Sequence, residues 1–159
     1  MKIELRRINY SAALSQETSA FTADLYIDGE LAFHVRNDGG GGGADFFHQV
    51  GRWTEAEAND WLKANRPRCT VCGISFEHDL EVEVGDLLAR ELESRRLKRL
   101  MRTNLLTIER GQVFQYPLRK RPIETIIGAV RATNVDAIIV NGASDEILGQ
   151  ALDIVRAAR

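Results

Sequence analysis

The sequence predicts an α+β fold, in which an N-terminal antiparallel sheet of hairpins is packed by helices and is followed by a second short hairpin and C-terminal helices. Alternating apolar and polar residues run from Phe21 to Val35 on both sides of Asp28-Gly29, which is the pattern of a β-hairpin. Apolar residues recur at helical spacing between Glu77 and about Arg102, which indicates a long helix. Two further short apolar runs flank Gly111 and indicate the second hairpin.

The length of 159 residues favours one domain over the whole chain, 1–159. Within it we expect a hairpin-rich part, 1–76, and a helix-rich part, 77–159. Hydrophobic residues make up 44% and charged residues 28%, and these proportions argue against a disordered chain. No apolar run reaches the roughly 18–20 residues of a membrane span, and the first residues lack the apolar core of a signal peptide. We therefore expect a cytoplasmic protein that does not enter a membrane.

The first predicted strand, Lys2–Tyr10, changes the parity of its alternation half-way. Its apolar residues follow one parity as far as Leu5 and the opposite parity from Ile8. A β-bulge near Arg6-Arg7 would reconcile the two halves. The small and polar residues 11–19 then form a connection.

The hairpin around Asp28-Gly29 has two candidate registers. A two-residue loop would pair Tyr26 with Leu31 and mix polar and apolar side chains on both faces. A three-residue loop, Ile27-Asp28-Gly29, puts the apolar residues on one face, and this favours it. That register pairs Leu25 with Leu31, Ala23 with Phe33 and Phe21 with Val35, and its other face carries Thr22, Asp24, Tyr26, Glu30, Ala32 and His34.

Five consecutive glycines follow this hairpin. Glycine loses the most backbone entropy on ordering, so such a run forms neither a helix nor a stable strand. The spacing of Gly39, Gly41 and Ala44 matches a dinucleotide-binding fingerprint only formally, because that fingerprint needs a strand before it and a helix after it. We expect a flexible loop that a partner could order on contact, formed by Gly39, Gly40, Gly41, Gly42 and Gly43.

The middle of the chain contains the best helix signals. Thr54 and Glu57 have the spacing of a capping box, and the helix that they open should end before Pro67. Arg68–Phe76 is a candidate for one short strand. The long helix Glu77–Arg102 follows, and its inward stripe consists of Leu80, Val84, Leu87, Leu88, Leu92, Leu97, Leu100 and Met101.

The C-terminal third begins with the second hairpin, formed by Thr103–Ile108 and Val113–Tyr116. Pro122 stands at a position typical of the first residue of a helix. Asp136–Val140 is a short buried strand, and Ser144 caps the last helix. The inward face of that helix consists of Ile147, Leu148, Ala151, Leu152 and Val155.

Residues 17–48 resemble the start of a family of small uncharacterised bacterial and phage-associated proteins. The matching features are Glu17-Thr18, the spacing of Phe21 and Ala23-Asp24, the Asp28-Gly29 turn, and Asn37 before a glycine-rich stretch that ends near a histidine. The resemblance covers the first third of the chain and brings no known activity, so no residue role is carried over. It implies an origin in a phage or mobile element, where small proteins often bind and inhibit a host factor.

Cys69 and Cys72 have the spacing of a pair of metal ligands. Structural zinc needs four ligands, and His48 and His78 could complete a set of two cysteines and two histidines. The two histidines have no motif spacing of their own. If Cys69 and Cys72 lie in one strand, their side chains face opposite sides, and the pair is then only structural.

Positive charge is concentrated in the second half of the chain. Nine basic residues lie between Arg95 and Arg121, with Glu109 as the only acidic residue, whereas the whole chain has a net charge of −2. Such a region can bind phosphates, although charge runs are usually solvated helix faces. Phe114 and Tyr116 share one face of the second hairpin and could stack on bases or lie in the core. The basic residues are Arg95, Arg96, Lys98, Arg99, Arg102, Arg110, Arg119, Lys120 and Arg121.

The leading hypothesis is a non-enzymatic binding protein whose basic region docks a nucleic acid or an acidic protein. The alternative is a zinc-dependent enzyme or metal-stabilised domain that uses Cys69 and Cys72 with the histidines. A third hypothesis is a phage-derived inhibitor that docks through the glycine loop and the acidic part of the long helix. A homodimer is also compatible with the sequence, and it could bury the basic region.

Overall fold

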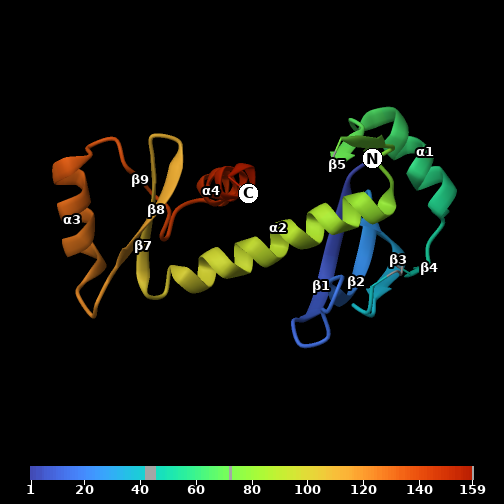
Figure 1. The fold of residues 1–159 in the computed structure, drawn as a ribbon, viewed down its shortest axis with the longest axis horizontal. Coiled ribbons are helices and arrows are strands. Elements are labelled where there is room, and N and C mark those ends of the chain that lie inside the picture. The colour runs from blue at the N-terminus through green and yellow to red at the C-terminus, as the bar shows by residue number, and fades with distance from the viewer. Residues whose placement is uncertain (42–45, 72, 159) are drawn as a thin grey trace. The chain divides into compact units, whose positions relative to one another are not determined.

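The chain divides into two compact units that together contain helices and mainly antiparallel sheets, which confirms the predicted α+β class. The computed structural model describes residues 1–41, 46–71 and 73–158. The units comprise Met1–Ala89 and Arg90–Arg159, so the boundary lies inside helix α2 (Leu80–Leu100) and not after residue 76. The N-terminal unit contains a four-stranded and a two-stranded sheet, the C-terminal unit contains a three-stranded sheet, and each unit has its own helices (Figure 1).

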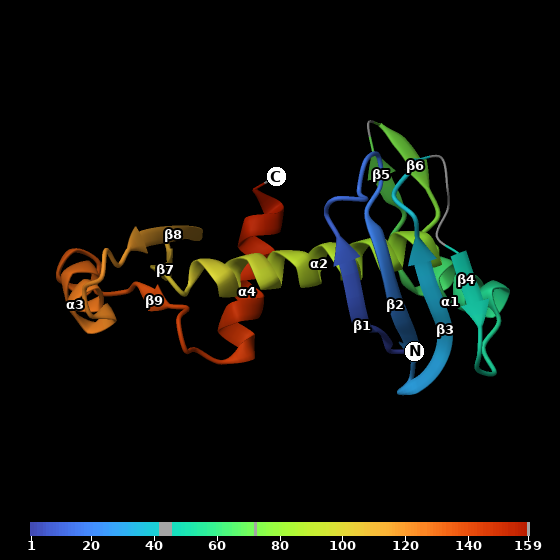
Figure 2. The ribbon, with the colours of Figure 1, turned by 90° about the horizontal axis from the view of Figure 1, so that it is seen from below.

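The N-terminal unit contains a four-stranded antiparallel sheet with the strand order β1-β2-β3-β4 (Figure 2). Its strands are β1 (Ile3–Ser11), β2 (Ala20–Ile27), β3 (Glu30–Asn37) and β4 (Phe46–Gln49). The pairing of β1 with β2 shifts between Arg6 and Asn9, and Arg7 has a positive φ of 51°. The predicted bulge in the first strand is therefore confirmed.

The predicted register of the β2–β3 hairpin is wrong. Its turn has two residues, both with positive φ, as in the type I′ turns that match the twist of a hairpin. Tyr26 pairs with Leu31, which is the pairing that the alternation alone disfavours. One extra residue, Ala32, then shifts the register so that Leu25 pairs with Phe33. This bulge allows the two-residue turn and one continuous apolar face to coexist.

Helix α1 (Glu55–Asn65) and the first turns of α2 cover one face of this sheet (Figures 1 and 2). The Thr54 hydroxyl accepts from the Glu57 amide and the Glu57 carboxylate accepts from the Thr54 amide, so the predicted capping box is confirmed. Asn59 Oδ1 accepts from the Leu80 amide at 2.8 Å and ties the two helices together. The largest fully buried side chains of the unit are Leu25, Ile27, Phe33, Val35, Leu62, Leu80 and Val84.

Residues 68–76 contain a tight hairpin and not the single strand that the sequence predicts. The hairpin consists of β5 (Cys69–Val71) and β6 (Ile74–Phe76). Gly73 in its turn has a φ of 80°, a conformation that glycine adopts without strain. Helix α2 then begins after Asp79, whose carboxylate accepts from the Val82 amide at 3.0 Å, and so starts later than expected.

The C-terminal unit consists of a three-stranded sheet with a helix on each face (Figure 1). Besides the second half of α2, its elements are β7 (Asn104–Glu109), β8 (Gln112–Pro117), α3 (Ile123–Thr133), β9 (Ile138–Ile139) and α4 (Asp145–Ala157). The strand order is β8-β7-β9. The β7–β8 hairpin confirms the second predicted hairpin.

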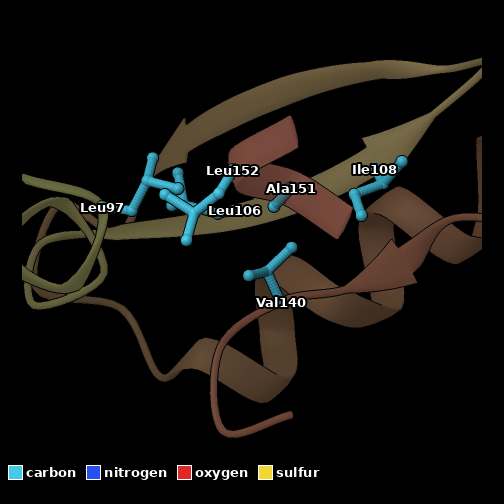
Figure 3. Close-up of a cluster of buried hydrophobic side chains, with 6 residues drawn as sticks. All are labelled: Leu97, Leu106, Ile108, Val140, Ala151 and Leu152. Atoms are coloured by element: carbon cyan, nitrogen blue, oxygen red, sulfur yellow. The ribbon is translucent and has the colours of Figure 1, made fainter. Parts of the chain in front are cut away.

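Two apolar clusters hold this unit together, one on each face of the sheet. On the α4 side, the buried residues include the end of α2 and the alternate residues of β7 (Figure 3): Leu97, Leu106, Ile108, Val140, Ala151 and Leu152. On the α3 side, the buried residues are Leu105, Ile126, Val130 and Ala137. Adjacent residues of β7 point to opposite clusters, because successive side chains of a strand alternate between its faces.

The helix starts and the last strand of this unit lie where the sequence predicts them, but their details differ. Pro122 is the residue before α3 and not its first helical residue. Ser144 occupies the position before α4, but its side chain makes no capping hydrogen bond. The strand expected over Asp136–Val140 is reduced to two residues, and Val140 joins the α4-side cluster.

Gly39 is fixed by hydrogen bonds, and this corrects the expectation of a flexible loop at that position. Its carbonyl oxygen accepts from the amides of Gln16, Glu17 and Thr18 at 3.1, 3.2 and 3.4 Å. Asn37 Oδ1 accepts from the Gly39 amide at 2.8 Å and from the Thr18 hydroxyl at 2.9 Å. The start of the glycine run is therefore held against the connection between β1 and β2.

The other glycines of the run differ in their surroundings. A β-carbon on Gly41 would collide with the Glu17 side chain, whereas one on Gly40 would meet open space. Gly42 and Gly43 lie outside the described residues.

Replacing Gly39 by alanine should destabilise the protein. At its φ of +81° a β-carbon would lie 2.4 Å from the Leu14 carbonyl oxygen and 2.8 Å from the Ala20 β-carbon. The left-handed backbone and the collision together should lower the free energy of unfolding by at least about 2 kcal/mol, as measured by urea denaturation. Gly40→Ala is the matched control and should change it by less than about 1 kcal/mol. Equal effects of the two substitutions would contradict this account.

Candidate functional site

The face of the N-terminal sheet opposite α1 and α2 carries a row of polar side chains. Asp24 on β2 pairs with His34 on β3, and His34 pairs with His48 on β4. Side chains of paired residues point to the same face of a sheet. The inward-pointing neighbours of this row, Leu25 and Phe33, are buried. The three polar residues, termed here the histidine row, therefore share one surface.

A short hydrogen bond orients the central member of the row. His34 Nδ1 lies 2.7 Å from Asp24 Oδ1. A carboxylate only accepts hydrogen bonds, so Nδ1 of His34 carries the proton and its Nε2 is an acceptor whenever the ring is neutral. The side chain of His34 is 52% exposed, and no described residue bonds Nε2.

The second oxygen of Asp24 is held by charge. Asp24 is only 8% exposed, and its Oδ2 makes no hydrogen bond with any described residue. The guanidinium of Arg7, which belongs to the bulge of β1, lies 3.2 Å from Oδ2. The carboxylate is thus clamped between His34 and Arg7.

A hollow of about 610 Å³ lies against the histidine row. Two arginines, Arg7 and Arg36, border it, and Asp24 is the one carboxylate among its described lining residues. The guanidinium carbon of Arg36 lies 5.2 Å from the centre of the exposed Phe46 ring. The hollow therefore offers cations and an aromatic face, which together suit an aromatic anion.

Sequence reasoning placed Asp24 and His34 on one face but gave them no role. The signal was present, because both residues stand at outward positions of the hairpin. The sequence does not place His48 beside these two residues, because its neighbour across the sheet is set by the pairing of β4 with β3. The Arg7 side chain extends from the bulge of β1 to Asp24. The sequence predicts the bulge but does not predict that Arg7 pairs with Asp24.

A second group of polar side chains, linked to one another by hydrogen bonds, lies in the same unit and contains two of the predicted zinc ligands. Cys69 Sγ lies 3.4 Å from His78 Nδ1, and His78 Nε2 lies 2.7 Å from Glu83 Oε2. Arg66 donates to the other oxygen of Glu83 at 2.8 Å. His78 and Glu83 are buried. Their polar side-chain atoms are therefore shielded from water and need these neighbours as hydrogen-bond partners.

The predicted set of zinc ligands needs correction at His48. That residue lies on β4, where its ring is parallel to that of His34 with the centres 6.4 Å apart. Across residues 1–41, 46–71 and 73–158, no three histidine, cysteine or acidic side chains gather as a metal site would require. Cys72 falls outside those ranges. Cys69 and His78 are the two predicted ligands that the structure brings together.

The predicted basic region is divided by the fold. Arg95 and Arg96 pair with Glu91 and Glu93 on their own helix at 2.8 and 2.7 Å. Arg110 occupies the β7–β8 turn, at the opposite end of the hairpin from the end of α2. These three residues therefore do not belong to one free basic surface.

The other six cations gather at one end of the C-terminal unit. The Leu118 amide donates to the Thr103 carbonyl at 3.0 Å, which ties the residues after β8 to those after α2. All six side chains are exposed, and none makes an ion pair with a carboxylate in the described part of the chain. This group, termed the basic end, consists of Lys98, Arg99, Arg102, Arg119, Lys120 and Arg121.

The two aromatic residues of the hairpin have different environments. Phe114 is 40% exposed. Tyr116 packs against the α3-side cluster and donates from its hydroxyl to Glu109 Oε1 at 3.0 Å. Burial, and then the hydrogen bond to this carboxylate, raise the pKa of Tyr116. Tyr116 is thus engaged within the unit, and stacking of either ring on bases stays a prediction.

Glu109 is the centre of this polar cluster. Its carboxylate accepts from the hydroxyl of Thr107, from Tyr116, and from the Asn134 side chain at 2.9 Å. These hydrogen bonds, with that of Thr107 the strongest, lower the pKa of Glu109 despite the opposing effect of burial. The cluster joins both strands of the hairpin to the end of α3.

A shallow hollow of about 320 Å³ adjoins the basic end. Arg119 and Arg121 stand at it, and most of its other lining residues are apolar or aromatic. They include Tyr116, Pro117, Ile126, Ala129 and Val130.

No protein-family model, curated protein or solved structure matches this chain. The resemblance of residues 17–48 to phage-associated proteins therefore stays a prediction. None of the helices among the described residues has the length and apolar composition that a membrane span requires.

The Glu109 cluster should make stability depend on pH in the acid range. A lowered pKa in the folded state stabilises the protein above the ordinary value of 4.5, and that stabilisation is lost as the pH falls through the folded-state pKa. Urea denaturation between about pH 6 and pH 3 should show wild type losing its advantage over Glu109→Gln. A difference between the two proteins that stays constant over this range would contradict the assignment.

Proposed function

We propose that this protein binds nucleic acid through the basic end of its C-terminal unit. The observation that carries the proposal is the gathering of six exposed cations, none paired with a described carboxylate, where the Leu118–Thr103 hydrogen bond joins two segments. A cation that is already neutralised by a neighbouring carboxylate releases few counterions when the protein binds a nucleic acid. Unpaired cations can each neutralise a phosphate and release a condensed counterion.

The backbone of the basic end supports a fixed presentation of its charges. Arg119 and Lys120 both have positive φ, at 47° and 64°. Residues other than glycine rarely adopt this backbone conformation, so the surrounding structure must hold the turn in place. The Arg121 amide closes the turn by donating to the Leu118 carbonyl at 2.8 Å.

The adjoining hollow favours a nucleic acid over an acidic protein. An acidic peptide would bind through its carboxylates to the cations alone and would not use the hollow. A nucleic acid also presents flat apolar bases beside its phosphates, and the largely apolar lining next to Arg119 and Arg121 offers them a surface. Single-stranded regions, whose bases are accessible, are therefore the preferred form.

Replacing Arg119, Lys120 and Arg121 together by glutamine should weaken binding of a single-stranded oligonucleotide and reduce its salt dependence. Each lost phosphate contact lowers the slope of log affinity against log salt by roughly 0.7, so the triple variant should lose about 2 from the slope. Fluorescence anisotropy over a range of salt concentrations measures both effects. Unchanged affinity and slope would refute the proposal.

Two controls identify the surface and the class of partner. Arg110→Gln removes an exposed cation at the far end of the hairpin and should leave binding nearly unchanged. A polyglutamate competitor carries charge without bases. If it displaces the oligonucleotide at equal charge concentration, the basic end recognises charge alone and an acidic protein becomes the better assignment.

A second candidate, a metal-stabilised hairpin, is favoured by the contact between Cys69 and His78. Tetrahedral zinc holds sulfur at about 2.3 Å and nitrogen at about 2.0–2.1 Å, which separates the two ligand atoms by about 3.6 Å. The observed Sγ–Nδ1 distance is 3.4 Å. The Glu83 carboxylate on the other ring nitrogen is also the outer partner that zinc-binding histidines usually have. Cys72 belongs to this set by its spacing alone.

Zinc analysis tests the second candidate. Protein reconstituted with zinc and then dialysed should retain the metal, and Cys69→Ser, Cys72→Ser and His78→Asn should each lose it. His48→Asn should retain zinc, because this histidine lies on β4 beside His34. Wild-type protein that retains no zinc above a buffer control would eliminate this candidate.

A further inference from the structure

We propose that the histidine row is an acid–base site that cleaves the phosphodiester bond of RNA by internal transesterification. The site lies on the N-terminal sheet and is independent of the basic end. Its chemical parts are a base, an acid, cations and an aromatic face around one hollow. Each part follows from a contact or an exposure described above.

His34 is suited to act as the base. Its Nδ1 is committed to the buried Asp24 carboxylate at 2.7 Å, which fixes the tautomer and leaves Nε2 to accept a proton. The same arrangement of a carboxylate behind an imidazole orients the base in many hydrolases. Asp24 touches no substrate in this scheme and is a positioning residue.

His48 is suited to act as the acid. Its exposed ring is parallel to that of His34, with the ring centres 6.4 Å apart and an interplanar angle of 5°. Two imidazoles at this separation can reach the attacking and leaving oxygens of one phosphate. Histidine is the side chain that exchanges protons most readily near neutral pH, so the pair can exist as one base and one acid.

The charges around the pair favour an anion with an aromatic portion. The groups that face the histidines are Arg7 from β1, Asp24 from β2 and Arg36 from β3. Asp24 is shared between Arg7 and His34, and Arg36 lies 3.8 Å from the Asp38 carboxylate, so an incoming phosphate competes with these two carboxylates for the two guanidinium groups. Phe46, 56% exposed beneath Arg36, offers a stacking surface for a base next to that phosphate.

The reaction needs no reagent beyond the substrate. His34 Nε2 removes the proton of a ribose 2′-hydroxyl while the 2′-oxygen forms a bond to phosphorus. The bond between phosphorus and the 5′-oxygen breaks, its electron pair stays on that oxygen, and protonated His48 supplies the proton. The products are a 2′,3′-cyclic phosphate and a free 5′-hydroxyl, and solvent returns both histidines to their starting states. DNA lacks the 2′-hydroxyl and is not cleaved.

A ribodinucleoside phosphate tests the proposal, because it fills the hollow without needing the basic end. Wild type should release the cyclic phosphate, and the 2′-deoxy analogue should remain intact. His34→Gln and His48→Gln should each lower kcat by about 100-fold or more. These variants, purified in the same way, also exclude a contaminating ribonuclease. No cyclic product from wild type, or full activity in either variant, would overturn the proposal.

Further variants separate positioning, folding and the two proposed sites. Asp24→Asn should lower kcat with little change in KM, and the nitrogen NMR signals of His34 should show loss of the single tautomer. Gln49→Ala on the same strand as His48 should retain the wild-type rate. The Arg119, Lys120 and Arg121 triple variant should also retain it, so failure of nucleic-acid binding at the basic end leaves this test intact.

Binding to the folded wild type provides a measurement that does not depend on variants. A ribonucleoside 3′-phosphate should shift the ring-proton NMR signals of His34 and His48 and leave those of buried His78 unchanged. Absence of any shift at His34 and His48 with millimolar nucleotide would also overturn the proposal.

Discussion

The bulge at Ala32 decides which side chains of the N-terminal sheet face one another. Without it, the two-residue turn would carry the pairing of Tyr26 with Leu31 along the whole hairpin. The bulge shifts the register so that Asp24 lies opposite His34. It is anchored by the two residues that follow β4, because the buried Ala32 carbonyl accepts from the amides of Val50 and Gly51 at 2.9 and 3.1 Å. Both the apolar inner face and the polar outer face depend on this one inserted residue.

Packing, more than ion pairing, stabilises the two units. Fully buried leucine and phenylalanine side chains contribute about 1.5–3 kcal/mol each, whereas exposed ion pairs contribute about 0–1 kcal/mol. The Arg90–Asp153 pair between α2 and α4 is exposed on both sides and stabilises little, while Leu106 and Ala151 in the same unit are almost fully buried. The polar groups of the histidine row and the basic end are therefore available for binding without being required for folding.

Helix α2 illustrates how a charge pattern has both a local and a tertiary meaning. Acidic residues in its first turn and basic residues in its last turn complement the helix dipole. Arg95 and Arg96 are also satisfied along the helix, because residues three or four positions apart are neighbours on its surface. Lys98 and Arg99 lie five and six residues past Glu93, the last acidic residue of the helix, which is beyond the three- or four-residue spacing of such pairs, and they make no ion pair among the described residues. Composition alone assigned all of these cations to one region.

The predictable parts of the fold were those in which neighbouring residues decide the outcome. The capping box at Thr54 needs only Glu57, and the bulge in β1 is visible as a change in parity between Leu5 and Ile8. The register of the β2–β3 hairpin was not predictable from alternation, because a bulge inside β3 compensates for the short turn. The β5–β6 hairpin was missed because each of its strands has only three residues.

By itself, the sequence determined the α+β class, the outward placement of Asp24 and His34, and the excess of cations after residue 94. These follow from periodicity and charge, which act between residues close in the chain. Only the tertiary structure decided that His48 joins His34 and not Cys69, and that Arg102 lies near the turn of Arg119 while Arg110 does not. Those neighbours come from strand pairing and from a single long-range hydrogen bond, and local residue patterns do not encode either one.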